Sequence, residues 1–218
     1  MPTMLSYLQS LFTPHEELEF LVEPFSHEEI DNIVKKMTGD KTLGLDGFNG
    51  SFLKKCWHVI KEDFYDLCDK FHEGNVNLES INSSFITLVS KISSPESISD
   101  FRPITLLNCS LKLLTKILAD RLQQVIIQLV HRYQYGLIRT RAIQDCLAWC
   151  FEFIHQCHQS RKEVLILKLD FEKAFDTVEH SAILSVMQHM GFPDVWLQWI
   201  RSILVSGSSA VLLKRSTG

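Results

Sequence analysis

The sequence predicts an α+β protein that is mostly helical with a small sheet. Six stretches carry apolar side chains at the spacing of one helix face, at residues 26–39, 49–73, 106–130, 142–158, 179–190 and 193–207. Three shorter apolar runs, at residues 85–89, 163–170 and 209–213, are rich in β-branched and aliphatic side chains and are typical of strands.

Local signals place the ends of the helices. Ser26 and Glu29 match a capping box, in which each side chain satisfies the other residue's backbone N–H at the start of a helix. Gly39, Gly74 and Gly191 follow apolar stripes at positions typical of helix C-termini, where a left-handed residue ends the helix.

Residues 41–48 read Lys-Thr-Leu-Gly-Leu-Asp-Gly-Phe and predict a loop. Two glycines around an acid suit a tight turn with a positive φ. Such a loop can also bring backbone N–H groups close to a phosphate, but the spacing does not match a P-loop. A structural turn is the preferred interpretation.

Composition indicates a globular protein without a general affinity for polyanions. Apolar residues make up 45% of the chain, charged residues make up 22%, and the net charge is −4. Positive charge gathers locally, because residues 102–141 hold seven basic side chains against one acid. That run predicts either a solvated helix face or a phosphate-binding surface. Its members are Arg102, Lys112, Lys116, Arg121, Arg132, Arg139 and Arg141, with Asp120.

The cysteines and the N-terminus indicate an intracellular protein, in the nucleus or the cytoplasm. None of the six cysteines forms a Cys-x-x-Cys pair, and Cys146, Cys150 and Cys157 have the spacing of small core residues on one helix. Residues 1–13 lack the basic and apolar regions of a signal peptide, and no apolar stretch is long enough to span a membrane.

Residues 163–176 carry the strongest indication of chemistry. Val164–Leu167 form an apolar run that predicts a strand buried on both faces, and this strand ends at Asp170. A carboxylate at the end of a buried strand is a common position for a ligand of a hard cation in phosphoryl or nucleotidyl transfer. The structural alternative is that Asp170 caps the following turn or helix. Asp176, six residues later, is expected to cap or anchor the next helix.

Six sequence blocks in order resemble the reverse transcriptase domain of LINE-type (non-long-terminal-repeat) retrotransposons, most closely those of plants. The resemblance runs from about Glu23 to the end of the chain. The blocks are KTLGLDGF (41–48), FITLVSK (85–91), DFRPITLLN (100–108), KILADRL (116–122), QYGLIRTRAIQD (134–145) and LKLDFEKAFDTVEH (167–180).

The resemblance implies a partial right-hand polymerase, with fingers and an incomplete palm. It divides the chain into an irregular segment (1–25), a fingers-like helical region (26–160) with a strand at 85–91, and a partial palm (161–218) bearing the Asp170 strand. The implied partners are an RNA template, a DNA primer and a deoxynucleoside triphosphate. The implied cofactor is Mg²⁺, bound as two ions.

The same resemblance implies roles for five residues. Asp170 is the first catalytic and metal-binding carboxylate, and the carbonyl of Phe171 is a further metal ligand. Phe175 lies under the incoming sugar and excludes a 2′-hydroxyl by its bulk. Arg102 and Lys91 neutralise the triphosphate, and Arg suits a planar pair of oxygens better than Lys.

Departures from the family pattern affect both the backbone and the catalytic site. Leu137 and Thr140 stand where the family usually has Phe and Gly, so Thr140 is strained if its φ is positive. The second acidic block of the family, an aromatic residue followed by Ala-Asp-Asp, does not occur in these 218 residues. The chain is therefore expected to be truncated before that block and to be inactive alone.

Two other functions are weighed against the polymerase. The first is a non-catalytic remnant with at most weak nucleic-acid binding. The second is an unrelated phosphotransfer protein with Asp170 as nucleophile. The phosphotransfer alternative ranks last, because it calls for a second Asp two residues later, where Glu172 stands.

Overall fold

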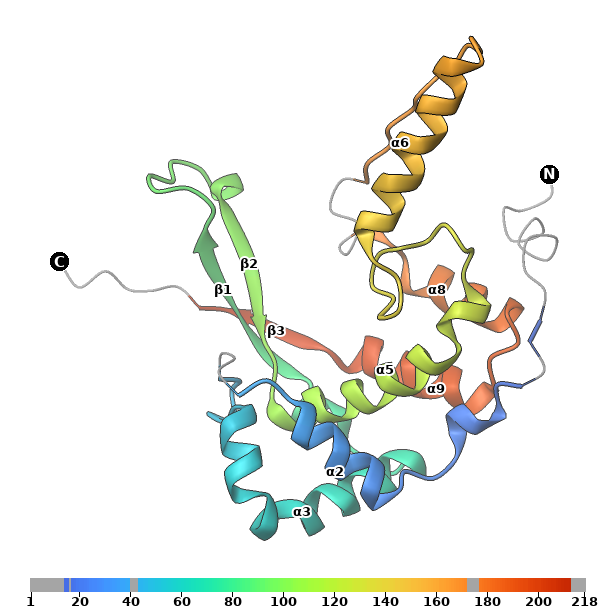
Figure 1. Ribbon diagram of the computed structural model, residues 1–218. Helices are drawn as coiled ribbons and strands as arrows, with labels where there is room; N and C mark the ends of the chain where they lie inside the picture. Colours follow the sequence, from blue (N-terminus) through green and yellow to red (C-terminus); the bar gives the residue numbers. More distant parts are fainter. Residues whose placement is uncertain (1–13, 16, 40–42, 172–176, 213–218) are drawn as a thin grey trace, which may run out of the picture. The chain divides into compact units, whose positions relative to one another are not determined.

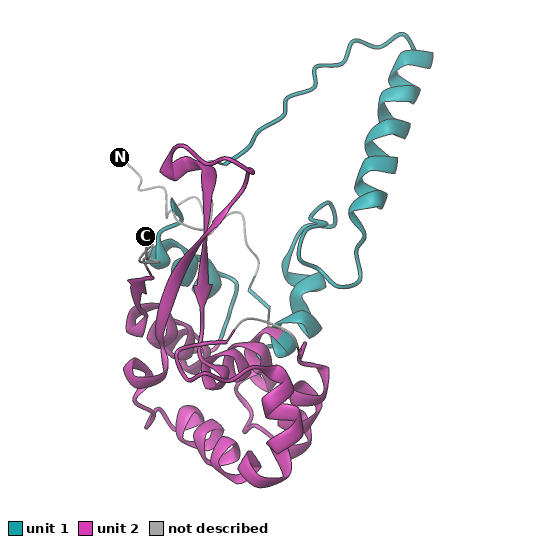
Figure 2. Cartoon of the chain, turned by 90° about the vertical axis from the view of Figure 1, so that its left-hand side faces the viewer, with its two compact units in different colours: residues 1–18, 120–192 teal, residues 19–119, 193–218 magenta. Residues whose placement is uncertain are grey.

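The computed structural model describes residues 14–15, 17–39, 43–171 and 177–212. The chain divides into two compact units, each discontinuous in sequence, and Figure 2 colours them separately. The smaller unit holds residues 1–18 and 120–192, and the larger holds residues 19–119 and 193–218. Within the described ranges, no helix combines the length and the apolarity needed to cross a membrane.

The described elements confirm a mostly helical α+β fold with a small sheet (Figure 1). The α-helices are α2 (His27–Lys36), α3 (Gly50–His72), α4 (Leu78–Ile81), α5 (Cys109–Leu129), α6 (Ile143–Gln159), α8 (His180–His189) and α9 (Asp194–Ser206). The strands are β1 (Ser83–Ser90), β2 (Phe101–Leu106) and β3 (Ser208–Val211), and two short 3₁₀ turns are η1 (Glu19–Val22) and η2 (Ile98–Asp100).

In the larger unit, α2 packs against α3 through an apolar stripe and one polar link. Ser26 caps α2 by accepting a hydrogen bond from the Glu29 backbone N–H at 3.2 Å, as the sequence predicts. Asp31, on the same helix, accepts hydrogen bonds from Trp57 Nε1 and from the Tyr65 hydroxyl, both at 2.7 Å. Because both donors lie on α3, a single carboxylate oxygen fixes the pairing of the two helices.

An aromatic cluster forms part of the core of this unit. The rings of Phe25, Phe71 and Trp199 lie with centroids 5.4 to 6.3 Å apart and are all at most 4% exposed. These residues come from the segment before α2, from α3 and from α9. Burying one large apolar side chain contributes about 1.5–3 kcal/mol to folding. The cluster therefore stabilises the packing of three segments that are distant in sequence.

The sheet has the strand order β2-β1-β3. β1 and β2 form an antiparallel hairpin in which Val89 lies opposite Arg102, and β3 runs parallel to β1 with Ser208 opposite Ser83 (Figure 1). The predicted strand at 85–89 is thus confirmed, and the one at 209–213 is confirmed as far as Val211. Pro103 lies in β2, an edge strand, where a residue without an N–H is tolerated.

Asn82 joins the end of α9 to the start of the sheet. Its buried side-chain amide donates hydrogen bonds to the Ile203 carbonyl at 2.8 Å and to Ser206 Oγ at 2.9 Å. Its own carbonyl accepts from the Ser208 N–H at 3.1 Å. This polar junction starts β3 alongside β1 directly after the helix.

In the smaller unit, the second half of α5 is tied to the loop that follows it. Arg139 pairs with Asp120 at 2.6 Å, and the Arg139 backbone N–H donates to Gln123 Oε1 at 3.2 Å. Leu137 in this loop has a φ of +65°, and Thr140 is not among the residues with positive φ. The strained position is therefore Leu137, whose carbonyl accepts a hydrogen bond from Gln123 Nε2 at 2.9 Å.

Helix α6 has no buried residues, although the spacing of its three cysteines predicts that they lie in the core. No residue of α6 is buried, and Cys150 is exposed, while Cys146 and Cys157 are partly exposed. The prediction that these three cysteines are core residues is wrong. Their spacing does place them on one apolar face of the helix, but within the described chain no element covers that face.

The buried strand predicted at Val164–Leu167 is not formed. Residues 162–171 have no regular secondary structure, and Leu165, Ile166 and Leu167 are 92%, 68% and 74% exposed. A strand exists only when a neighbour pairs with its backbone groups, and no described strand lies beside this segment. The run is apolar, but it is neither paired nor buried. The predicted subdomain limits stay a prediction.

Candidate functional site

The tip of the β1–β2 hairpin brings together two of the predicted site residues. Arg102 lies opposite Val89, and the Lys91 N–H donates to the Asp100 carbonyl at 2.7 Å, which extends the ladder by one pair. Side chains of paired residues share a face, and the face alternates from one pair to the next. Lys91 follows β1 directly, and continuing this alternation by one residue puts it on the face that carries Arg102, as its diagonal neighbour.

Both cations are available at this face. The side chains of Lys91 and Arg102 are exposed, and within the described part of the chain neither has an ion-pair partner. Lys91 Nζ donates to the Ser99 carbonyl at 2.7 Å, which is a neutral acceptor. The arrangement presents two positive charges side by side to solvent.

Asp100 holds the hairpin loop in shape. Its Oδ2 accepts hydrogen bonds from the backbone N–H of Ser97 at 2.9 Å and of Glu96 at 3.0 Å, and from Ser97 Oγ at 3.2 Å. The backbone hydrogen bonds from Ser97 and Glu96 lower the pKa of Asp100. Since the Asp100 carbonyl also accepts from Lys91, this residue fixes the position of Lys91 relative to the strand.

Asp46 shows that the loop at 43–48 has a structural role. Its Oδ2 accepts a hydrogen bond of 2.6 Å from the Cys109 N–H at the start of α5, and its own N–H donates to Asn108 Oδ1 at 3.1 Å. Asn108 Nδ2 in turn donates to the Ile81 carbonyl at 3.0 Å. The first turn of α5 thus already faces a carboxylate, which takes the place that a phosphate would occupy.

The glycines of the same loop serve its close packing, as the turn interpretation predicts. Gly47 has a φ of +72° and donates to the Gly44 carbonyl at 3.1 Å. A Cβ added at Gly44 would lie 2.3 Å from the Leu107 carbonyl oxygen. Sequence reasoning recognised the turn but missed the Asp46–Cys109 link, because no local pattern identifies a partner so distant in sequence.

The predicted acidic site is only partly described. Asp170 and Phe171 are exposed and lie in chain without regular structure, and Phe175 and Asp176 fall outside the described residues. Among the described residues, no group of three or more His, Cys, Asp or Glu side chains could hold a metal ion. Mg²⁺ takes several converging oxygen ligands, so the residues described here do not fit a two-ion site by themselves.

Two arginines of the basic run are engaged inside the smaller unit. Arg139 pairs with Asp120, and Arg141 Nη1 donates to the carbonyls of His131 and Gln134, both at 2.7 Å. Arg121 is only 5% exposed. The run therefore serves partly to hold the chain together, while Arg102 is exposed to solvent.

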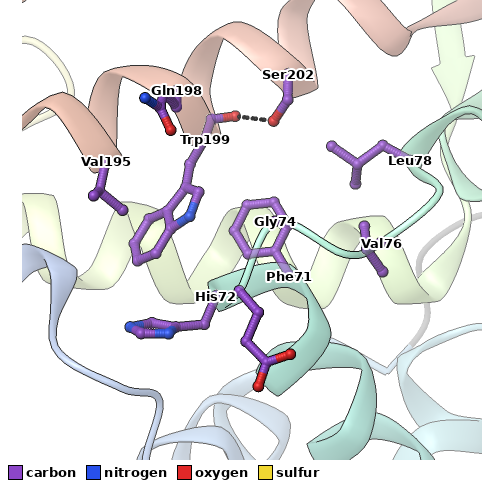
Figure 3. Close-up of a pocket in the computed structure, with 10 residues that line it drawn as sticks. Phe71, His72, Gly74, Val76, Leu78, Val195, Gln198, Trp199 and Ser202 are labelled. Carbon is purple, nitrogen blue, oxygen red and sulfur yellow. Dashed lines mark hydrogen bonds between the residues drawn. The ribbon is translucent and has the colours of Figure 1, made fainter.

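A pocket of about 370 Å³ lies elsewhere in the larger unit. Figure 3 shows the rings of Phe71 and Trp199, from α3 and α9, at this pocket, with Ser202 Oγ donating to the Trp199 carbonyl at 2.8 Å. None of the residues predicted to bind nucleotide or metal lines it. Its aromatic walls belong to the core cluster described above.

Comparison with protein families gives a match over more than half of the chain. The sequence profile described as "Reverse transcriptase (RNA-dependent DNA polymerase)" matches residues 90–217. The matched range contains Lys91, Arg102 and the segment around Asp170.

Curated relatives are proteins of transposable elements. A 149 kDa protein of transposon TX1 from Xenopus laevis is 26% identical over 231 residues, covering 97% of this chain and 18% of the relative. A putative 115 kDa protein of the type-1 retrotransposable element R1DM from Drosophila melanogaster is 29% identical, covering 92% of this chain and 19% of the relative. The Pol polyprotein of the type-1 retrotransposable element R2 from Popillia japonica is 30% identical, covering 57% of this chain and 17% of the relative. The chain spans less than a fifth of the length of these relatives.

Proposed function

The chain belongs to the reverse transcriptase family, and from this premise we propose that it is the fingers and part of the palm of an RNA-directed DNA polymerase of a non-LTR retrotransposon. Its substrates are a deoxynucleoside triphosphate, an RNA template and a DNA primer, and it acts inside the cell. The resemblance of the sequence blocks to this class, and the relatives from transposable elements, support the assignment.

The observation that carries the proposal is that Lys91, directly after β1, neighbours Arg102 of β2 at the tip of the hairpin. A triphosphate presents several anionic oxygens in a row. The Arg102 guanidinium can donate two parallel hydrogen bonds to one phosphate, and the Lys91 ammonium can act as a point charge on the next. Two neighbouring cations without ion-pair partners in the described chain suit this ligand.

The acidic segment completes the proposal. If Mg²⁺ is bound, Asp170 would supply its first carboxylate and Phe171 a carbonyl oxygen, and Phe175 would exclude a ribonucleotide. The described residues do not bring further carboxylates to Asp170. We therefore propose that these 218 residues alone bind nucleotide without polymerising it.

Binding of a fluorescent deoxynucleoside triphosphate tests this function. Arg102→Ala and Lys91→Ala are each expected to weaken binding about tenfold, because each removes a charge-assisted contact of about 1.5 kcal/mol. Arg201→Ala and Lys55→Ala are the matched controls, since both side chains are exposed and belong to α9 and α3 rather than to the hairpin. Equal affinity in all four variants, or no binding by the parent, contradicts the proposal.

A second candidate is a non-catalytic remnant that binds nucleic acid weakly. The exposed, unpaired chain around Asp170 favours it. The two candidates differ in selectivity. A remnant would bind RNA through Arg102 in a salt-dependent way but would not prefer a triphosphate over a monophosphate. The polymerase proposal expects that preference.

A further inference from the structure

We propose that Ser94 is a phosphorylation site. A phosphate on Ser94 binds Lys91 and prevents Lys91 and Arg102 from binding a triphosphate. Ser94 lies in the hairpin loop between β1 and β2, and it is followed by Pro95. The effect on nucleotide binding rests on the proposed function, whereas the modification and its contact with Lys91 do not.

Ser94 is accessible to a protein kinase, because it lies in an exposed loop. Every residue from 91 to 99 is exposed, and the stretch before η2 forms no regular secondary structure. A protein kinase binds its substrate as an extended segment, and Ser94 lies in a bend of an exposed loop that has no helix or strand to unfold before it can extend. Proline at the next position also lacks an N–H, a feature by which proline-directed kinases choose their substrate.

Among the described residues, the hydroxyl of Ser94 makes no hydrogen bond, unlike those of Ser97 and Ser99 in the same loop. Ser90 Oγ donates to the Ile92 carbonyl, and Ser97 Oγ lies 2.6 Å from Ser99 Oγ and also bonds Asp100. Within the described chain, the hydroxyls of Ser93 and Ser94 make no such bond. Of these two, only Ser94 is followed by proline.

A phosphate on Ser94 would have a cationic partner nearby, the ammonium of Lys91. The hairpin tip carries two cations, Lys91 and Arg102, and two carboxylates, Glu96 and Asp100. A phosphoserine adds a charge of about −1.5 to −2 and three strong acceptor oxygens. Lys91 is three residues from Ser94, and its ammonium now bonds only the neutral Ser99 carbonyl among the described atoms. A phosphate is the stronger acceptor, so Lys91 transfers to it.

The chemistry is an ordinary phosphoryl transfer from ATP by a proline-directed protein kinase. A bond forms between Ser94 Oγ and the γ-phosphorus, and the bond from that phosphorus to the β–γ bridging oxygen breaks. The hydroxyl proton passes to the base of the kinase, and ADP leaves. The tip changes from balanced charge to a net negative charge, which repels a triphosphate and occupies Lys91.

The test begins with phosphorylation of the purified chain. Thr13 also precedes a proline, so the chain carries Thr13→Ala throughout. It is incubated with a proline-directed serine/threonine kinase and ATP, and the product is mapped by tandem mass spectrometry. We expect one phosphate on Ser94, retained in Ser93→Ala and lost in Ser94→Ala. The absence of phosphate on Ser94 overturns the proposal.

Two measurements then test the contact and its effect. In ³¹P NMR titrations, the phosphoserine pKa is expected to be lower in the parent than in Lys91→Ala, and equal values overturn the contact. Triphosphate binding is expected to weaken about fivefold on phosphorylation, and unchanged binding overturns the regulation. If the unmodified chain binds no triphosphate, the proposed function fails, while mass spectrometry and ³¹P NMR still decide the Ser94 proposal.

Discussion

Asp46 Oδ2 accepts a 2.6 Å hydrogen bond from the backbone N–H of Cys109, 63 residues further along the chain. The carboxylate thereby satisfies a free N–H in the first turn of α5 and stands at the positive end of the helix dipole. Burial, and then the Asp46 carboxylate, raise the pKa of the Cys109 thiol to about 11, so this thiol stays protonated. One side chain therefore joins the glycine loop to α5.

Replacing Asp46 by Ala is expected to reduce the free energy of unfolding by about 1–3 kcal/mol, because it leaves the Cys109 N–H without its charged acceptor. Urea unfolding followed by circular dichroism measures the change. Asp63→Ala is the control, since Asp63 is exposed on α3. A loss no larger than in the control would show that the link contributes nothing to stability.

Tyr65 makes the stability of the chain sensitive to alkaline pH. Burial, and then the hydrogen bond to Asp31, raise the pKa of Tyr65 from 10.0 to about 12. A raised pKa in the folded state favours the protonated phenol. Its contribution is therefore complete below the unfolded pKa and is lost as pH rises through the folded value. Unfolding free energies are expected to fall between about pH 10 and pH 12.

Tyr65→Phe separates this effect from the titration of other groups. The variant keeps the ring but cannot ionise, so its stability is expected to fall less steeply over the same pH interval. Parallel alkaline profiles for parent and variant would contradict the assignment.

Asp31 has a related effect in acid. Burial raises its pKa, but the hydrogen bonds from Tyr65 and Trp57 outweigh burial and lower it overall, so its contribution is lost as pH falls.

Leu137→Gly is expected to stabilise the chain by about 1 kcal/mol. Leu137 has a φ of +65° and a side chain that is 87% exposed, so glycine removes a left-handed strain of about 1–2 kcal/mol without loss of packing. Part of the gain is offset by the greater freedom of glycine in the unfolded chain. Thr140→Gly, where φ is not positive, is expected to give no gain. A stabilisation by Thr140→Gly instead would mean that the strain was assigned to the wrong residue.

The exposed apolar run at Leu165–Leu167 is expected to promote aggregation, because unpaired backbone with apolar side chains can pair with another chain. Ile166→Lys is expected to lower the aggregated fraction in analytical ultracentrifugation while leaving the melting temperature unchanged. Val59→Lys is the control, since Val59 is an isolated valine that is 68% exposed on α3. If both substitutions act equally, general charge rather than this run governs solubility.

Primer extension on an RNA template is expected to be absent for these 218 residues with either Mg²⁺ or Mn²⁺. Two-metal transfer calls for several converging carboxylate oxygens, and only Asp170 is assigned to the site. Asp170→Ala is the matched variant. Extension by the parent that disappears in the variant would show that Glu172, Asp176 or a second copy of the chain completes the site.

The sequence by itself determined those features that depend on near neighbours. Ser26 and Glu29 marked the start of α2, the apolar stripes located the helices, and six ordered blocks identified the reverse transcriptase family. These signals can be read locally, because capping and helical periodicity act within a few residues.

Only the tertiary structure decided how distant segments meet. The pairing of β1 with β2 brought Arg102 next to Lys91 at the hairpin tip, and the approach of the loop to α5 gave Asp46 its partner. The same dependence explains the error at Val164–Leu167. An apolar run carries β propensity, but a strand also needs a neighbour to pair with its backbone, and the local sequence does not specify where that neighbour lies.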